Sequence, residues 1–152
     1  MSLDLQLQAS LENLPRWMEA ISLEAEQMGL PEKRIREVEL ALEEALVNIV
    51  SYAYDEPAGK IQIRSFRDDA QSRWLIQITD QGKPFDVAKA SDPDIQAPLS
   101  EREIGGLGIY LIRKLMDDVS YERRGNRNIL TLYVKLPDST AQNASGIPEP
   151  NP

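Results

Sequence analysis

The sequence predicts an α+β protein, a two-layer α/β sandwich with a mixed, mostly antiparallel sheet and helices on one face. Two observations lead to this prediction. Segments with strand-like alternation follow one another across short polar turns, which favours antiparallel neighbours. Three helix-like segments are available to cover one face of such a sheet. A doubly wound dinucleotide-binding fold is not expected, because no strand leads directly into the glycine-rich segment at 104–112.

The predicted elements follow from periodicity and from turn residues. Alternating leucines predict a first strand over residues 3–7, and amphipathic patterns predict helices over 15–28 and 31–52. The remaining elements are strands at 60–66 and 73–79, a long loop at 80–103, a helix at 106–116, and strands at 119–123 and 128–136. Residues 138–152 have the composition of a disordered tail, so residues 1–137 are expected to form one domain.

Composition excludes several classes of function. The chain has 152 residues and a net charge of −8 without a basic stripe, so direct nucleic-acid binding is not expected. It has no long apolar stretch and no basic n-region at its start, so we expect a cytoplasmic protein with no membrane span. It also contains no Cys and no His. Disulfides, thiolate metal sites and Ser-His catalysis are therefore excluded, and chemistry must come from carboxylates, amides, hydroxyls, backbone groups and bound metal.

Glu44 and Asn48 form a polar pair on the long predicted helix. Their spacing of four stacks them on one side, away from the centre of the apolar face. An amide oxygen can ligate Mg²⁺, and a carboxylate can orient or deprotonate a nucleophile. An isolated pair at this spacing is more often an ordinary solvated stripe, so alone it decides nothing.

Asp80 and Gly82 come directly after a predicted buried strand, in the segment "TDQGKPFD". An ordinary turn accounts for this pattern when it stands alone. The functional alternative is a carboxylate fixed at the edge of a pocket, where Asp80 accepts a hydrogen bond from an exocyclic amine such as that of adenine. Gly82 would then leave space for the flat face of the base.

Three glycines, Gly105, Gly106 and Gly108, precede the third predicted helix. They provide either a flexible joint or room for something that must approach the backbone closely. A helix N-terminus offers unpaired N–H groups and partial positive charge, which suits phosphate. The sequence therefore predicts a phosphate cradle here, with residues 81–104 as a lid that closes over a nucleotide.

These three elements together resemble a known family. Glu44-Ala-Leu-Val-Asn48 resembles the N box of the GHKL ATPase superfamily, and the segments 80–86 and 105–108 resemble its two glycine boxes. The amino-acid sequences of these segments are similar to those of the anti-sigma-factor serine kinases of the RsbW and SpoIIAB kind. The resemblance implies the Bergerat ATP-binding fold, with ATP and Mg²⁺ as ligands.

The resemblance also implies roles for individual residues. Glu44 would be the catalytic base, Asn48 would hold Mg²⁺, and Asp80 beside Gly82 would bind the adenine amine. Residues Gly105, Gly106, Leu107 and Gly108 would form the lid hinge and phosphate cradle. A polar residue on a late strand, Asn128 or Thr131, would lie near adenine, and Arg102 is expected to reach the terminal phosphate.

The implied function is an ATP-binding anti-sigma factor and protein serine/threonine kinase. Such a protein sequesters a sigma factor and phosphorylates a STAS-type anti-anti-sigma partner, and the family also implies a homodimer. Two alternatives remain: a non-catalytic, nucleotide-dependent protein-binding switch, and a stand-alone catalytic module of the histidine-kinase type. For the partner surface we expect Arg16 to point outward, whereas helical spacing with Ile21 places Trp17 in the core.

Overall fold

The structure is a computed structural model that describes residues 3–53, 59–84 and 106–137. The strands are β1 (Leu3–Gln8), β2 (Lys60–Asp68), β3 (Arg73–Asp80), β4 (Asp118–Arg124) and β5 (Arg127–Lys135). The helices are α1 (Leu14–Gln27), α2 (Glu32–Asn48) and α3 (Gly106–Leu115), with a 3₁₀ turn η1 (Leu11–Asn13) and a π-helical turn η2 (Ile49–Ala53). This order of strands and helices confirms the predicted order.

The five strands form one sheet in the order β1-β2-β3-β5-β4, and every neighbouring pair among them is antiparallel. The prediction allowed a mixed sheet, and the structure is the purely antiparallel case. The reason lies in the last hairpin. β4 runs parallel to β3, but β5 returns between them and pairs with both, so no parallel neighbours meet.

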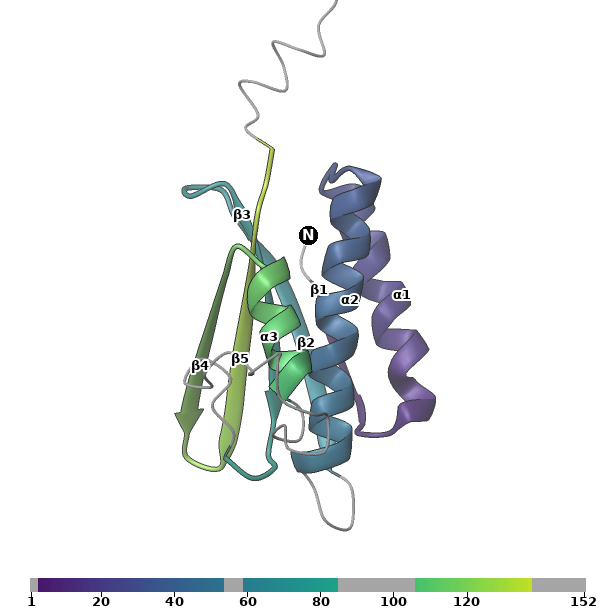
Figure 1. Ribbon diagram of the computed structural model, residues 1–152, viewed down its shortest axis with the longest axis vertical. Coiled ribbons are helices and arrows are strands. Elements are labelled where there is room, and N and C mark those ends of the chain that lie inside the picture. Colours follow the sequence, from purple (N-terminus) through teal and green to yellow (C-terminus); the bar gives the residue numbers. More distant parts are fainter. Residues whose placement is uncertain (1–2, 54–58, 85–105, 138–152) are drawn as a thin grey trace, which may run out of the picture.

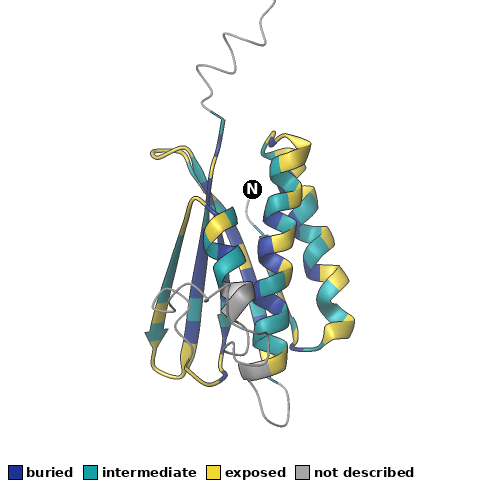
Figure 2. Cartoon of the chain, in the orientation of Figure 1, coloured by how far each residue is buried: buried dark blue, intermediate teal, exposed yellow. Residues whose placement is uncertain are grey.

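The helices cover one face of the sheet (Figure 1). Strand alternation explains which face, because successive side chains point to opposite sides. Ile61 and Ile63 of β2 and Trp74, Ile76 and Ile78 of β3 are fully buried beneath the helices. Figure 2 shows buried residues concentrated where the helices meet the sheet and exposed residues at the turns.

The boundary of each helix has a local cause. Pro15 lies in the first turn of α1, where its missing N–H costs nothing. Gly29 ends α1 with a φ of 78°, and the N–H of Leu30 reaches back to the carbonyl of Ala25 at 3.3 Å. This is the Schellman pattern that favours glycine after a helix. The second helix was predicted to reach residue 52; its regular part stops at Asn48, and the π-helical turn η2 continues it.

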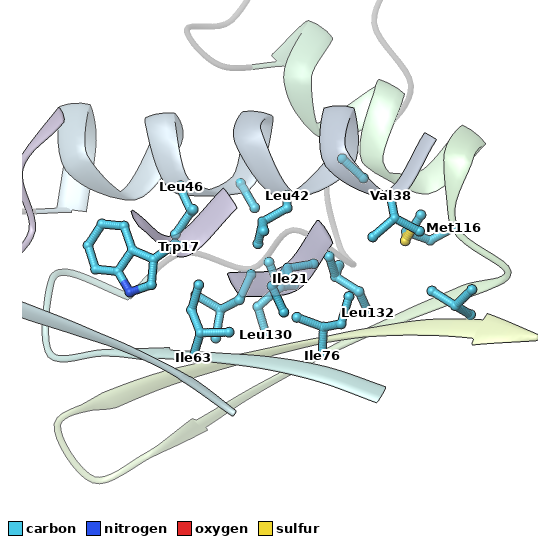
Figure 3. Close-up of a cluster of buried hydrophobic side chains, with 14 of the residues drawn as sticks. Trp17, Ile21, Val38, Leu42, Leu46, Ile63, Ile76, Met116, Leu130 and Leu132 are labelled. Carbon is cyan, nitrogen blue, oxygen red and sulfur yellow. The ribbon is translucent and has the colours of Figure 1, made fainter. Parts of the chain in front are cut away.

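The core lies between the two layers (Figure 3). Trp17 and Ile21 of α1 and Leu42 of α2 pack against the isoleucines of the sheet, and each is at most 1% exposed. The placement of Trp17 in the core is thus confirmed, and Arg16 beside it is exposed, as expected.

The topology gathers several chain segments at one end of the molecule. Figure 1 shows the C-terminal ends of α2 and β3, the β4–β5 turn and the first turn of α3 toward the lower end. The register fixes part of this arrangement, because Asp80 of β3 pairs with Asn128 of β5, and Asn128 pairs with Arg123 of β4. Most residues with predicted site roles therefore belong to this end.

Candidate functional site

Asp80 lies buried at the end of β3, with 4% of its surface exposed. Its Oδ1 accepts the backbone N–H of Gly82 at 2.7 Å and the side-chain amide of Asn128 at 3.0 Å. Both of these hydrogen bonds go to Oδ1. Oδ2 receives none of the hydrogen bonds found among the described residues and is the oxygen that a ligand amine can use.

Asn128 is buried on β5, opposite Asp80. Its amide nitrogen also donates to the carbonyl of Lys83 at 2.8 Å, and its Oδ1 accepts the Tyr121 hydroxyl at 2.5 Å. Asn128 therefore lies beside Asp80, and its predicted place near adenine stays a prediction. Because both ends of the Asn128 amide are occupied by protein groups, this residue shapes the site by holding Asp80 and the loop after it. Thr131 lies on the opposite side of β5 from Asn128, since three positions along a strand change the face.

The electrostatics of Asp80 balance opposing effects. Burial raises the pKa of the Asp80 carboxyl above its ordinary value. The hydrogen bonds from Asn128 and Gly82 and the positive charge of Arg123 lower the same pKa, without cancelling the effect of burial. A buried carboxylate with protein donors on one oxygen can accept an N–H from a ligand amine on its other oxygen.

Glu44 and Asn48 lie one turn apart at the C-terminal end of α2, both partly buried. The amide nitrogen of Asn48 is buried and has no hydrogen-bond partner among the described residues. Buried polar groups are normally paired, so a ligand bound at this end of α2 would satisfy this amide. The side-chain amide can present either its nitrogen or its oxygen by a half-turn, and the oxygen is a magnesium ligand. The π-helical turn η2 begins immediately after Asn48, and such turns are frequent at functional sites.

Within the described ranges, no cluster of three or more acidic side chains could hold a metal ion on its own. The lack of such a cluster among the described residues is compatible with Mg²⁺. Mg²⁺ keeps several waters and is commonly bound by one or two protein groups together with substrate phosphates. The amide of Asn48 is one such group, so the residues present fit a magnesium–nucleotide complex.

The glycine segment is described only in part. The helix α3 begins at Gly106, as predicted, and its first backbone N–H groups are those of residues 106–108. A helix start of this kind is suited to phosphate. Gly105, Arg102 and most of the predicted lid at 81–104 lie outside the described residues.

Arg123 and Tyr121 are site residues that the sequence reading missed. Arg123 donates to the carbonyl of Gly82 at 2.8 Å and to Oδ1 of Asn128 at 3.1 Å. Strand periodicity could have placed both residues on the helix-covered face of the sheet, because every second residue of β4 (Val119, Tyr121 and Arg123) lies on that face. A cation on that face needs polar partners, and the loop after β3 and Asn128 of β5 supply them.

Comparison with known protein families identifies the domain. The model of the histidine kinase-like ATPase domain matches residues 7–134. This chain belongs to that family. The match covers β2, β3 and β4 in full, nearly all of β5 and the end of β1, and it includes Glu44, Asn48, Asp80 and Asn128.

Relatives and solved structures narrow the position within the histidine kinase-like ATPase family. The chain is 34% identical over 116 residues to proteins named serine-protein kinase RsbW from Bacillus cereus (strain AH820) and Bacillus anthracis, covering 73% of this chain and 71% of each relative. This confirms the resemblance drawn from the motifs.

Two solved structures share the fold. One contains the RsbU and RsbW domains of Rv1364c from Mycobacterium tuberculosis, with a TM-score of 0.66 at 14% identity over 90% of this chain and 32% of that chain. The other is the histidine kinase domain of a blue-light activated kinase from Erythrobacter litoralis, with a TM-score of 0.53 at 18% identity, over 88% of this chain and 62% of that one. Both likenesses confirm the architecture of the ATPase domain. None of the helices in the described part of the chain is long and apolar enough to cross a membrane.

Proposed function

We propose that this chain is an ATP-dependent protein serine/threonine kinase and anti-sigma factor that acts in the cytoplasm. It sequesters a sigma factor and phosphorylates one Ser or Thr of a small STAS-type anti-anti-sigma protein, without contacting nucleic acid itself and as a homodimer. Relatives named serine-protein kinase RsbW support this proposal, as does the presence of every N-box side chain that the chemistry needs.

One observation carries the nucleotide part of the proposal. Among the described residues, Oδ1 of Asp80 accepts two protein donors and Oδ2 accepts none, and the Asn48 amide, which has no partner there either, belongs to the same end of the molecule. A base that offers an exocyclic amine satisfies the first group, and a magnesium-bound phosphate satisfies the second. Adenine carries such an amine at its 6-position, whereas guanine carries an oxygen there.

Each residue then has one task in the transfer. Asp80 orients the base, the N–H groups at the start of α3 bind phosphate oxygens, and Asn48 holds Mg²⁺. When bound, Mg²⁺ supplies charge neutralisation on the phosphates. Glu44 accepts the proton of the attacking hydroxyl as that oxygen bonds to the γ-phosphorus and the bond to the leaving ADP oxygen breaks.

The test pairs two neighbouring glutamates. Wild type, Glu44→Gln and Glu43→Gln are incubated with γ-labelled Mg·ATP and candidate STAS proteins, and the phosphorylated residue is mapped. Glu43 is exposed and adjacent on α2, so it controls for loss of one charge. We expect Glu44→Gln to reduce the rate of phosphoryl transfer by about 10²-fold or more. It should still bind Mg·ATP, because a general base acts in the transfer step and is not needed for nucleotide binding. Glu43→Gln should retain activity.

The other outcomes separate the rival functions. If Glu44→Gln transfers phosphate at the wild-type rate, the assignment of the base is wrong. If the wild type binds Mg·ATP and a partner protein but transfers no phosphate to any candidate, the chain is a nucleotide-dependent binding switch. Transfer to a histidine of a separate protein would support the histidine-kinase-type module.

A further inference from the structure

Side chains from the β4–β5 hairpin hold the loop that follows β3. The carbonyl of Gly82 accepts Arg123 Nη1 at 2.8 Å and the Asn128 amide at 3.4 Å, and the carbonyl of Lys83 accepts the same amide at 2.8 Å. The N–H of Gly82 in turn donates to Asp80. The loop, the Asp80 carboxylate and the hairpin are therefore one hydrogen-bonded unit.

Arg123 stands at the centre of this unit. Its Nε donates to the carbonyl of Gly125 in the hairpin turn at 3.1 Å, which fixes the plane of the guanidinium group. Its Nη1 reaches both Gly82 and Oδ1 of Asn128. Only a guanidinium group presents separate N–H groups in a fixed plane to three acceptors at once.

The orientation of the Asn128 amide depends on these donors. Arg123 and the Tyr121 hydroxyl both donate to Oδ1, so the NH₂ group must face Asp80 and the loop carbonyls. If the amide turned over, two donors would face an NH₂ group and Asp80 would face a carbonyl oxygen. Each such mismatch in a buried site is costly.

We propose that Arg123 is a positioning residue for the nucleotide base, which locks the Asn128 amide and the Gly82 carbonyl so that Oδ2 of Asp80 faces the exocyclic amine. This inference rests on the proposed function, since it concerns the adenine end of the same site. Arg123 touches no reacting atom. Its contribution is to base recognition, and the effect of losing it depends on whether the nucleotide carries the amine.

The experiment removes the amine from the ligand and Arg123 from the protein. Affinities for Mg·ATP and for the magnesium complex of purine riboside triphosphate, which lacks the 6-amino group, are measured by calorimetry. We expect Arg123→Gln to weaken ATP about tenfold and to leave purine riboside triphosphate within about twofold. Arg123→Lys, which keeps the charge but not the planar fork, should fall between wild type and Arg123→Gln for ATP.

Two further variants make the result specific. Arg124→Gln removes the same charge from the neighbouring residue, which is exposed and bonds to Glu122 at 2.8 Å, so both affinities should stay at wild-type values. Tyr121→Phe removes the second donor to Asn128 without changing charge. It should reduce the preference for ATP in the same direction, and it tests the inference if Arg123→Gln does not fold.

The experiment distinguishes failure of the positioning role of Arg123 from failure of the proposed function. Equal weakening of both nucleotides by Arg123→Gln, or no weakening of either, would overturn the positioning role while the proposed function stands. A wild type that binds no Mg·ATP would overturn the proposed function and this inference with it.

Discussion

The buried carboxylate of Asp80, which we propose binds the nucleotide base, has a cost to the stability of the fold. Taking a charge out of water is unfavourable, and two donors on one oxygen compensate only in part, since the pKa of Asp80 remains raised. A fold optimised for stability alone would place a neutral group here. A side chain retained against that cost is expected to have a ligand.

Replacing Asp80 with Asn should therefore separate binding from stability. Asn keeps the size and one acceptor oxygen, but it puts an NH₂ group where Oδ2 faces the amine. We expect ATP affinity to fall by about 10–100-fold, because two donors then meet without an acceptor. GTP affinity should change little, and the thermal midpoint should stay at or above wild type. Calorimetric titration with both nucleotides checks this, with Asp4→Asn on the exposed edge of β1 as the charge control.

The raised pKa of Asp80 leads us to expect that stability and ATP affinity both depend on pH. Between the ordinary carboxyl pKa and the raised pKa of Asp80, the folded chain binds more protons than the unfolded chain, so the free energy of unfolding falls as pH rises through that window. The stability advantage of Asp80→Asn should thus shrink as pH falls through the same window. ATP affinity of the wild type should drop there too, because a protonated Oδ2 is no longer a free acceptor. A flat affinity profile would remove the Asp80 carboxylate from the base-binding role.

The sequence patterns singled out Asp80 and Gly82, and the family resemblance offered Asn128 or Thr131, but neither predicted the hydrogen bonds that join Asp80, Gly82 and Asn128. Asp80 and Asn128 become neighbours only because β5 inserts beside β3, after a loop, a helix and another strand. Local patterns contain no information about that pairing. Glu24 is a similar case: helical spacing puts it on the face of Trp17 and Ile21, but its partner, the Ser65 hydroxyl at 2.5 Å, comes from β2 and is set by the tertiary packing.

At the scale of elements, Arg34 ties the beginning of α2 to the end of α3. It donates to the carbonyl of Leu115, the last residue of α3, at 2.5 Å and to Asp117 at 2.7 Å. Asp117 also accepts the backbone N–H of Lys135 on β5 at 2.6 Å. One guanidinium group thus satisfies a helix end and joins it to the sheet, at the end of α2 opposite Asn48.

Arg34→Met should lower the free energy of unfolding by about 1–3 kcal/mol, because it leaves a helix carbonyl and a carboxylate without their charged donor. Mg·ATP affinity should be unchanged, since the candidate site lies at the other end of the molecule. Denaturant titration measures the first quantity and calorimetry the second. Arg36→Met is the control: Arg36 pairs with Glu32 on the exposed surface, and such pairs contribute little. Equal losses in the two variants would contradict this role for Arg34.

Element boundaries were predictable where turn chemistry is local and less so where packing decides. Gly29 and Pro15 mark the ends of α1 in the sequence, and the structure uses both. The β2–β3 turn instead contains Ser72 at a φ of 52°. A serine gives no sequence signal for this left-handed conformation, which is uncommon for residues other than glycine. The carbonyl of Ser72 accepts the N–H of Leu136, so a contact with the end of β5 helps to hold this turn.

At the scale of the whole molecule, the proposed transfer requires a second protein to approach the lower end of Figure 1. The first turn of α1 lies at that same end, because α1 and α2 run in opposite directions. Arg16 is exposed in that turn, and its neighbour Trp17 is 1% exposed and anchors the helix in the core. Arg16 is thus a cation on a rigid support in a chain of net charge −8.

We therefore expect Arg16→Glu to weaken binding of the protein partner by about tenfold, because reversing a charge at an interface removes an attraction and adds a repulsion. ATP affinity and the thermal midpoint should stay at wild-type values, since the Arg16 side chain is exposed. Titration against a cognate sigma factor or STAS protein measures the effect. Arg64→Glu supplies the control, because Arg64 is also exposed but lies on the sheet face that the helices leave uncovered. If Arg64→Glu weakens binding of the partner and Arg16→Glu does not, the partner binds the open face of the sheet. The hydroxyl that we propose Glu44 deprotonates would then have to come from a segment that reaches around the edge of the molecule.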